Sequence, residues 1–258
     1  MESIQVGQKF FLRFKNLSQS GVFHFSSTKP GWGEEGKSRF TGDEPSIYKS
    51  YRDELANGFS MENSQFIFPR QVHGKHVEII EGPIESEDIP ETDALITKQS
   101  GICVCVQTAD CVPILIFDPV QKVIAAVHAG WRGTVDKIVS KTIFSMQRKF
   151  NSFPEDLIVG IGPSIHMHVY EVGHDVINQV REKLTNYKQL LKPSIHPNKA
   201  YFDLWEANRT LLTSTGVLPE NIEIMGFCSF SHEDFFYSAR RDGADTGRMV
   251  SGIMLTGK

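Results

Sequence analysis

The chain has 258 residues and a formal net charge of -4, with 40% hydrophobic and 22% charged residues. This composition is typical of a soluble globular protein that buries a sizeable core, and it argues against binding to nucleic acid or to an anionic membrane. The four cysteines form no CxxC pair, and no run is long and apolar enough for a membrane span, so we expect a cytoplasmic protein.

In chain order, the N-terminal part predicts short strands around one helix. We expect strands at 9–14, 21–26, 65–68 and 76–80, and a helix over 46–56 that ends at Asn57-Gly58. Residues 28–39 read as a polar loop that contains glycine and proline. The acidic stretch 81–93 predicts a solvated loop.

Three apolar runs in the middle of the chain predict strands at 102–106, 112–117 and 123–127. Each run has about the length of a strand and is rich in β-branched residues. Cys111 lies after the first strand and His128 after the third. A thiol and an imidazole are thus expected at strand ends, where loops carry chemistry on a rigid scaffold.

The C-terminal half predicts three helices and three further strands. Helices are expected at 134–150 with Thr134 as cap, at 175–184, and at 203–214 with a capping box of Asp203 and Glu206. Strands are expected at 157–161, 222–226 and 249–255. Strands outnumber helices and adjoin one another, which predicts an α+β fold with mixed β-sheets flanked by helices. No linker-like tract divides the chain, so we expect a single domain over residues 1–258.

Cys111 and His128 need a third partner, and His73 is the best candidate because it also follows a strand and precedes a glycine. Two imidazoles and a thiolate suit zinc, and three protein ligands leave a fourth position open, as in catalytic zinc sites. The spacing alone favours a buried structural role for any one of the three. A second hypothesis is a cysteine hydrolase with a Cys111/His128 dyad, oriented by Asp110 or Asn208.

Arginines form the other polar cluster of the sequence. Arg240, Arg241 and Arg248 lie within nine positions, where they could bind a phosphate or a carboxylate. A solvated hairpin with ion pairs to Asp242 and Asp245 explains the same pattern equally well. Arg132 lies in the loop that follows His128, where an anion contact is plausible.

These motifs resemble a known family, the multi-copper polyphenol oxidoreductase or YfiH-like family, whose members are also called laccase-domain proteins and purine nucleoside phosphorylases. The matching blocks occur in the same order and cover nearly the whole chain. They are residues 71–74, 108–113, 127–133, 161–163, 170–172, 240–243 and 246–248.

The resemblance implies a YfiH-like, cysteine-hydrolase-like α+β fold and a zinc site with His73, Cys111 and His128 as ligands. It implies phosphorolysis of adenosine, inosine and S-methyl-5'-thioadenosine with inorganic phosphate, and deamination of adenosine. On this basis we expect catalytic roles for Asp110, Cys111, His128 and Arg132. Contacts to the substrate are expected from Lys29, Gln71, Arg240, Arg241 and Arg248. The sequence leaves the oligomeric state open.

Two positions depart from the family pattern. Lys29 stands near the place where the family usually has arginine, and lysine lacks the bidentate fork. Ser164 stands where the family usually has cysteine, but this is not one of the ligand candidates. A copper-dependent polyphenol oxidase is a weaker alternative, because nine histidines with one HxH pair cannot readily build a multicopper oxidase. A further alternative is a non-enzymatic zinc module, which a fourth ligand such as Cys228 would favour.

Overall fold

The computed structural model describes residues 2–32, 37–42, 44–82, 88–89 and 91–257. The expected α+β class with mixed sheets is confirmed. A seven-stranded sheet has the order β1-β2-β3-β16-β8-β4-β6, a six-stranded sheet the order β15-β11-β9-β10-β7-β5, and a small sheet the order β12-β14-β13. The strands are β1 (Glu2–Val6), β2 (Lys9–Arg13), β3 (Val22–Ser27), β4 (Phe66–Pro69), β5 (Val77–Ile80), β6 (Asp88–Ile89), β7 (Ala94–Thr97), β8 (Cys103–Thr108), β9 (Val112–Asp118), β10 (Val123–Ala129), β11 (Ile158–Ile161), β12 (Glu171–Val172), β13 (Leu191–Pro193), β14 (Ala200–Phe202), β15 (Ile222–Ile224) and β16 (Met249–Leu255).

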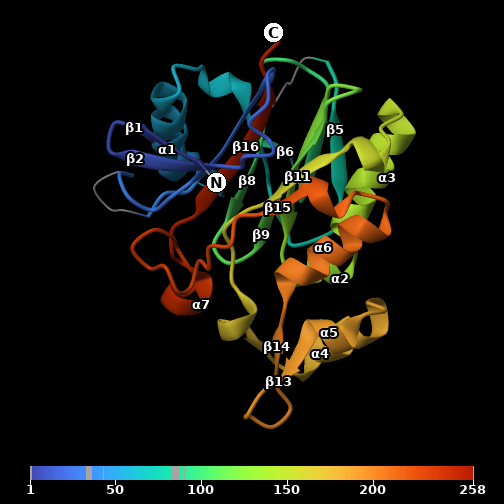
Figure 1. Cartoon of the computed structure of the whole chain (residues 1–258). Helices are drawn as coiled ribbons and strands as arrows, with labels where there is room; N and C mark the ends of the chain where they lie inside the picture. Colours follow the sequence, from blue (N-terminus) through green and yellow to red (C-terminus); the bar gives the residue numbers. More distant parts are fainter. Residues whose placement is uncertain (1, 33–36, 43, 83–87, 90, 258) are drawn as a thin grey trace.

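Two helical groups enclose the large sheets (Figure 1). The α-helices are α1 (Pro45–Gly58), α2 (Trp131–Val135), α3 (Ile138–Phe150), α4 (His174–Lys183), α5 (Tyr187–Leu190), α6 (Leu204–Ser214) and α7 (Ala239–Asp242). Short 3-10 turns lie at η1 (Asn63–Gln65), η2 (Pro154–Asp156), η3 (Met167–Val169) and η4 (Pro219–Asn221). Helix α1 packs on the outer face of the seven-stranded sheet, and α2, α3 and α6 pack on the six-stranded sheet.

Alternation along the central strands explains these layers. In β9, Leu115 and Phe117 pack into the core between the two large sheets, whereas Ile114 and Ile116 pack under the helices. All seven residues of β9 are buried. A strand with apolar residues on both faces is expected where a sheet is covered on both sides, because side chains alternate along the strand. The same pattern makes β9 and β10 the buried centre of the molecule.

The expected helix over 134–150 is wrong at its start, because two helices occupy this stretch. Asp136 and Lys137 separate α2 from α3, and Lys137 adopts a left-handed conformation with φ 62°. Thr134 is therefore not a cap but lies inside α2, whose N-cap is Gly130. The Asp203 cap is confirmed, since its side chain accepts a hydrogen bond from the Glu206 amide. Glu206 itself pairs with Arg209 at 2.8 Å.

Other elements were not expected from the sequence. They include β1, β7, and the small sheet of β12, β13 and β14. The loop expected at 28–39 and the acidic loop expected at 81–93 lie partly outside the described residues; in the described part of the acidic loop, Asp88–Ile89 forms β6. Among the helices that the structure describes, none is long and apolar enough to cross a membrane.

One buried histidine makes the stability of the fold depend on pH. His24 in β3 is fully buried, and its Nε2 accepts a hydrogen bond from the Phe14 amide at 3.0 Å. Burial, followed by the charge of Arg13, lowers the pKa of His24 to about 4. In the unfolded chain the imidazole binds a proton below about pH 6.5, so the unfolded state gains protons first as the pH falls.

We therefore expect the free energy of unfolding to fall by about 2–3 kcal/mol through His24 between pH 7 and pH 4.5. Urea denaturation of the wild type and of His24→Gln, each at both pH values, measures this loss. The variant should lose less stability on acidification than the wild type. Equal losses in the two proteins would show that His24 is not the buried group that titrates.

Candidate metal centre

The turn between β8 and β9 carries Asp110 and Cys111. Asp110 has φ 94°, a left-handed value that costs a residue with a side chain some strain. Its carboxylate holds the turn, since Oδ1 accepts a hydrogen bond from Ser229 Oγ and Oδ2 one from the Arg240 amide, both at 2.7 Å. The turn thereby fixes the Cys111 thiol, which is partly buried, at the edge of the sheet.

Strand pairing brings His128 next to this thiol. In the antiparallel register of β9 and β10, His128 lies opposite Pro113 and Ala129 opposite Val112, the residue after Cys111. The side chain of His128 is 2% exposed. The predicted meeting of Cys111 and His128 at strand ends therefore follows from the register of two buried strands.

Asp93 positions the two histidines, although its acidic neighbours in the sequence predict a solvated loop. This expectation is wrong, because Asp93 is fully buried. Its carboxylate accepts hydrogen bonds from the amides of His73 at 3.0 Å and Gly74 at 2.7 Å, which fold the loop after β4. Its Oδ1 also lies 2.8 Å from Nδ1 of His128. The sequence signal was the position of Asp93 directly before the buried strand β7.

The three predicted ligands meet at one point. One donor atom from each of His73, Cys111 and His128 lies within 4.8 Å of the others, and this is a group able to hold a metal ion among the described residues. The two imidazole rings lie edge to face with centroids 4.8 Å apart. Because Nδ1 of His128 binds Asp93, its Nε2 is the nitrogen left for a ligand.

This donor set fits zinc. Two imidazole nitrogens and one thiolate are preferred zinc ligands, and here their donor atoms all lie within 4.8 Å of one another. A buried carboxylate behind a histidine is the usual support of such a ligand. Gly130 leaves room for the group, since a Cβ there would lie 3.0 Å from the Cys111 sulfur and 3.2 Å from the His73 ring.

The charges around Cys111 favour its thiolate form, which is the form that binds a metal ion. Burial raises the pKa of Cys111, but the charge and hydrogen bond of His128, followed by those of His73, outweigh it and lower the pKa to about 6. Burial lowers the pKa of His128, whereas the Cys111 thiolate and Asp93 raise it to about 9. The pair is thus a thiolate and an imidazolium at neutral pH, and a metal would displace the imidazolium proton.

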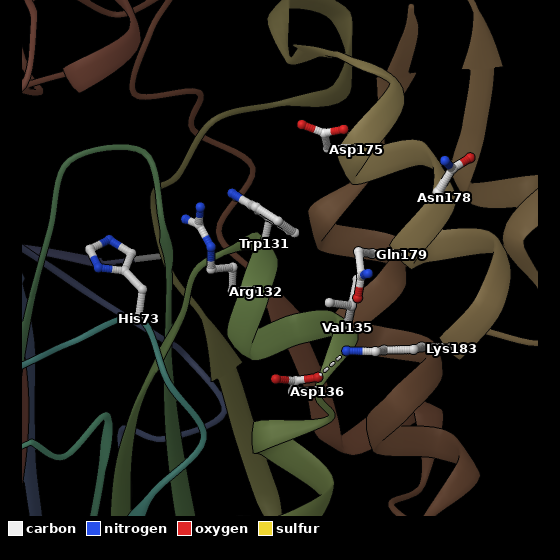
Figure 2. A pocket seen from close by; sticks show the side chains of 9 residues that line it. All are labelled: His73, Trp131, Arg132, Val135, Asp136, Asp175, Asn178, Gln179 and Lys183. Carbon is white, nitrogen blue, oxygen red and sulfur yellow. Dashed lines mark hydrogen bonds and ion pairs between the residues drawn. The ribbon is translucent and has the colours of Figure 1, made fainter.

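A cavity of about 510 Å³ opens beside His73, between α2 and α4. Figure 2 shows His73 at one side and α4 at the other, with Trp131 and Arg132 projecting between them from the start of α2. At the base, Lys183 of α4 forms an ion pair with Asp136 at 2.6 Å. The cavity is large enough for a small organic ligand.

Arg132 and Arg240 each stack on an aromatic ring. The exposed Arg132 lines the cavity and stacks on Trp131 at 4.4 Å. Arg240 stacks on the ring of Tyr170 at 5.1 Å and donates a hydrogen bond to the Glu171 carbonyl at 2.8 Å. The nearby charges of Cys111 and Asp110 act on the buried Tyr170, whose pKa is raised first by burial. The sequence pattern around Tyr170 predicts no role for this residue.

Arg241 and Arg248 are engaged with the chain itself. Arg241 donates to the carbonyls of Ser229, Phe230 and Phe236 and forms an ion pair with Asp242 at 2.7 Å. Arg248 donates to the carbonyls of Ala244, Thr246 and Gly247. The alternative of a solvated hairpin is wrong, because this stretch begins with helix α7. The ion pair with Asp242 is confirmed, whereas Asp245 pairs with Arg39 at 2.6 Å.

Two further residues that were expected to contact the substrate, Gln71 and Lys29, also form hydrogen bonds with the backbone. The side chain of Gln71 accepts a hydrogen bond from the Gln107 amide of β8 and donates one to the Gln107 carbonyl, both at 2.8 Å. The Lys29 ammonium donates to the Glu233 carbonyl at 3.2 Å. The roles of these residues in substrate binding stay predictions, as do those of Asp110 and the arginines.

The residues named in the alternatives lie elsewhere. Asn208 donates to Thr134 Oγ1 at 3.1 Å and to the Leu204 carbonyl at 2.9 Å, and the residue that orients His128 is Asp93. Cys228 is not in the ligand group; its sulfur accepts a hydrogen bond from the His166 amide at 3.3 Å. Within the described residues, no fourth protein ligand closes the group.

Comparison with known proteins adds to this geometry. The family model for the multi-copper polyphenol oxidoreductase laccase matches residues 27–256. A purine nucleoside phosphorylase of Bacteroides thetaiotaomicron is 35% identical over 96% of this chain and 97% of its own length. Adenosine deaminase RL5 from an unknown prokaryotic organism is 34% identical over 83% of this chain and 84% of its own. The crystal structure of Bacillus licheniformis YfiH superposes with a TM-score of 0.85 at 26% identity, covering 96% of each chain.

Proposed function

The chain belongs to the multi-copper polyphenol oxidoreductase laccase family and is an enzyme, and on that premise we propose that it is a zinc-dependent purine nucleoside phosphorylase. Its substrates would be adenosine, inosine or S-methyl-5'-thioadenosine together with inorganic phosphate, and its products the free base and the (methylthio)ribose 1-phosphate. A second activity would be deamination of adenosine, the activity named for one relative. We further propose that it acts in the cytoplasm.

The observation that carries the proposal is a three-donor group beside a cavity of about 510 Å³. A zinc ion bound there would supply an open coordination position that polarises an oxygen of phosphate, of the ribose or of water. His73 lines the cavity as well as belonging to the group. A ligand in the cavity would therefore lie directly against the donor group.

The side chains around the group have separate tasks in this account. Arg132 would hold the phosphate at the cavity, because its guanidinium is exposed there and pairs with no described carboxylate. Asp93 holds His128 and the His73 loop in place through the bonds described above. Asp110 would act in the same way on the Cys111 turn, because both of its carboxylate oxygens already accept hydrogen bonds.

The products of adenosine test the proposal. With zinc-loaded protein, we expect adenine and ribose 1-phosphate only when phosphate is present, and inosine in its presence or absence if deamination also occurs. Chromatography of the bases with and without phosphate measures both. If zinc-loaded protein releases no adenine in the presence of phosphate, the phosphorylase proposal fails. A blue absorption band with stoichiometric copper would instead favour the polyphenol oxidase.

One observation favours a second candidate, the cysteine hydrolase. Asp93, His128 and Cys111 are linked in the order of an acid, a base and a nucleophile, with the thiol pKa lowered to about 6. The contact of His73 with the same thiol distinguishes the two, since a nucleophile needs one imidazole and a metal site uses both. Removal of zinc with a chelator would leave a hydrolase active and would abolish the proposed activity.

A further inference from the structure

A second cavity lies at the edge of the six-stranded sheet, between α3 and the edge strand β5. Its volume is about 330 Å³, and it shares no lining residue with the first cavity. The residues that line it are Lys75, Val77, Lys141, Phe144, Ser145 and Arg148. Three of them are cationic, and none of the described lining residues is acidic.

The helix presents one face to this cavity. Lys141, Phe144, Ser145 and Arg148 follow the spacing i, i+3, i+4 and i+7, which places them along one side of α3. Lys75 lies in the segment before β5, facing the same space. Phe144 is 52% exposed, although it is a large apolar residue. An aromatic ring and three cations thus surround one opening.

No carboxylate among the described residues forms an ion pair with Lys75, Lys141 or Arg148. Lys75 approaches Lys141 closely, and the pKa of Lys141 is lowered first by burial and then by the charge of Lys75. Asp136 acts on both lysines from a distance, but its Oδ1 is bound to Lys183 at 2.6 Å. Outside the cavity the pattern differs, since the neighbouring Lys149 pairs with Glu81 at 2.8 Å. Two adjacent like charges are unfavourable, and an anion between them would offset the cost.

We propose that this cavity is a binding site for a small phosphate ester. The phosphate lies between Lys75, Lys141 and Arg148, because a dianion with several acceptor oxygens matches two ammonium groups and a guanidinium. The organic part of the ester packs on Phe144. The cavity exceeds what a bare phosphate needs and suits a ligand the size of a mononucleotide. The site is separate from the proposed active site and does not depend on it.

Titration calorimetry with adenosine 5'-monophosphate, inorganic phosphate and adenosine tests this site on the zinc-loaded protein. Lys141→Gln removes one cation from the cavity, and Lys149→Gln on the same helix removes one outside it. We expect the monophosphate to bind about tenfold more weakly to Lys141→Gln than to the wild type, and unchanged to Lys149→Gln. Adenosine should bind equally to all three proteins, since it carries no phosphate.

A further variant, Phe144→Ala, separates the ester from free phosphate. It should weaken binding of the monophosphate and leave binding of inorganic phosphate unchanged. Equal affinity of the monophosphate for Lys141→Gln and Lys149→Gln would overturn the site, as would the absence of binding to the wild type. If Phe144→Ala weakens neither probe, the ligand is not an ester that uses this ring. Each readout is a binding constant, so failure of the proposed phosphorylase activity would not be mistaken for failure of this site.

Discussion

Replacing Cys111 by alanine is expected to reduce bound zinc from about one ion per chain to near zero and to abolish phosphate-dependent release of adenine. The thiolate is one of only three protein donors in the group, so its loss leaves two imidazoles to hold the ion. Structural zinc sites bind with about 10–16 kcal/mol through four ligands, so one ligand contributes roughly 3–4 kcal/mol, or a loss of about 100- to 1000-fold in affinity. Elemental analysis and turnover, measured on the same samples, give both results.

Cys228→Ala is the matched control for this variant. Cys228 is also a buried free cysteine, but its sulfur lies outside the donor group and accepts a hydrogen bond from the His166 amide. This control should keep its zinc and its turnover. Zinc retained by Cys111→Ala with turnover lost would make Cys111 a nucleophile instead of a ligand, and would support the hydrolase.

Replacing Asp93 by asparagine is expected to lower zinc affinity by about 10- to 100-fold, although Asp93 touches no ion itself. The carboxylate fixes the ring of His128 through Nδ1 at 2.8 Å and folds the loop of His73 through its amide at 3.0 Å. An amide of the same shape removes the charge that stabilises the His128 proton. Competition with a chelator of known zinc affinity, together with the unfolding free energy, measures the two effects separately.

Asp118→Asn provides the control, because it makes the same change at a buried aspartate that lies away from His73 and His128. Asp118 is also fully buried, and its Oδ1 accepts hydrogen bonds from the amides of Val120 and Gln121. It ends β9 at the side opposite Cys111, about 20 Å along the strand. Asp118→Asn should destabilise the fold and leave zinc affinity unchanged. Equal zinc affinities in the two variants would show that Asp93 supports only the fold.

The sequence predicts Cys111 and His128 as partners because both lie at the ends of strands that are easy to predict, whereas their role as metal ligands is implied by the family resemblance. Val112–Asp118 and Val123–Ala129 are β-branched, buried runs, and the antiparallel register of two such neighbours brings Cys111 and His128 together. Met249–Leu255 was predicted at its observed bounds for the same reason. The pairing of these strands needed no knowledge of the remaining chain.

The supporting residues were harder to predict, because their roles depend on contacts that are distant in the sequence. Asp93 follows several acidic residues, a pattern that predicts a solvated side chain. Its carboxylate nevertheless accepts a hydrogen bond from the His73 amide, in a loop 20 residues earlier. The sequence pattern around Arg241 predicts an anion ligand, but its guanidinium donates hydrogen bonds to three carbonyls of a neighbouring segment. The break at Lys137 depends on one left-handed residue that no helical periodicity reveals.

X-ray absorption at the zinc edge of the zinc-loaded protein tests the central claim most directly. The account predicts one sulfur at about 2.3 Å, two imidazole nitrogens at about 2.0–2.1 Å and one further light atom that exchanges with added phosphate or solvent. Any zinc that still binds to Cys111→Ala should show no sulfur in its shell. Two sulfurs in the shell, or none in the wild type, would contradict a zinc site built from His73, Cys111 and His128.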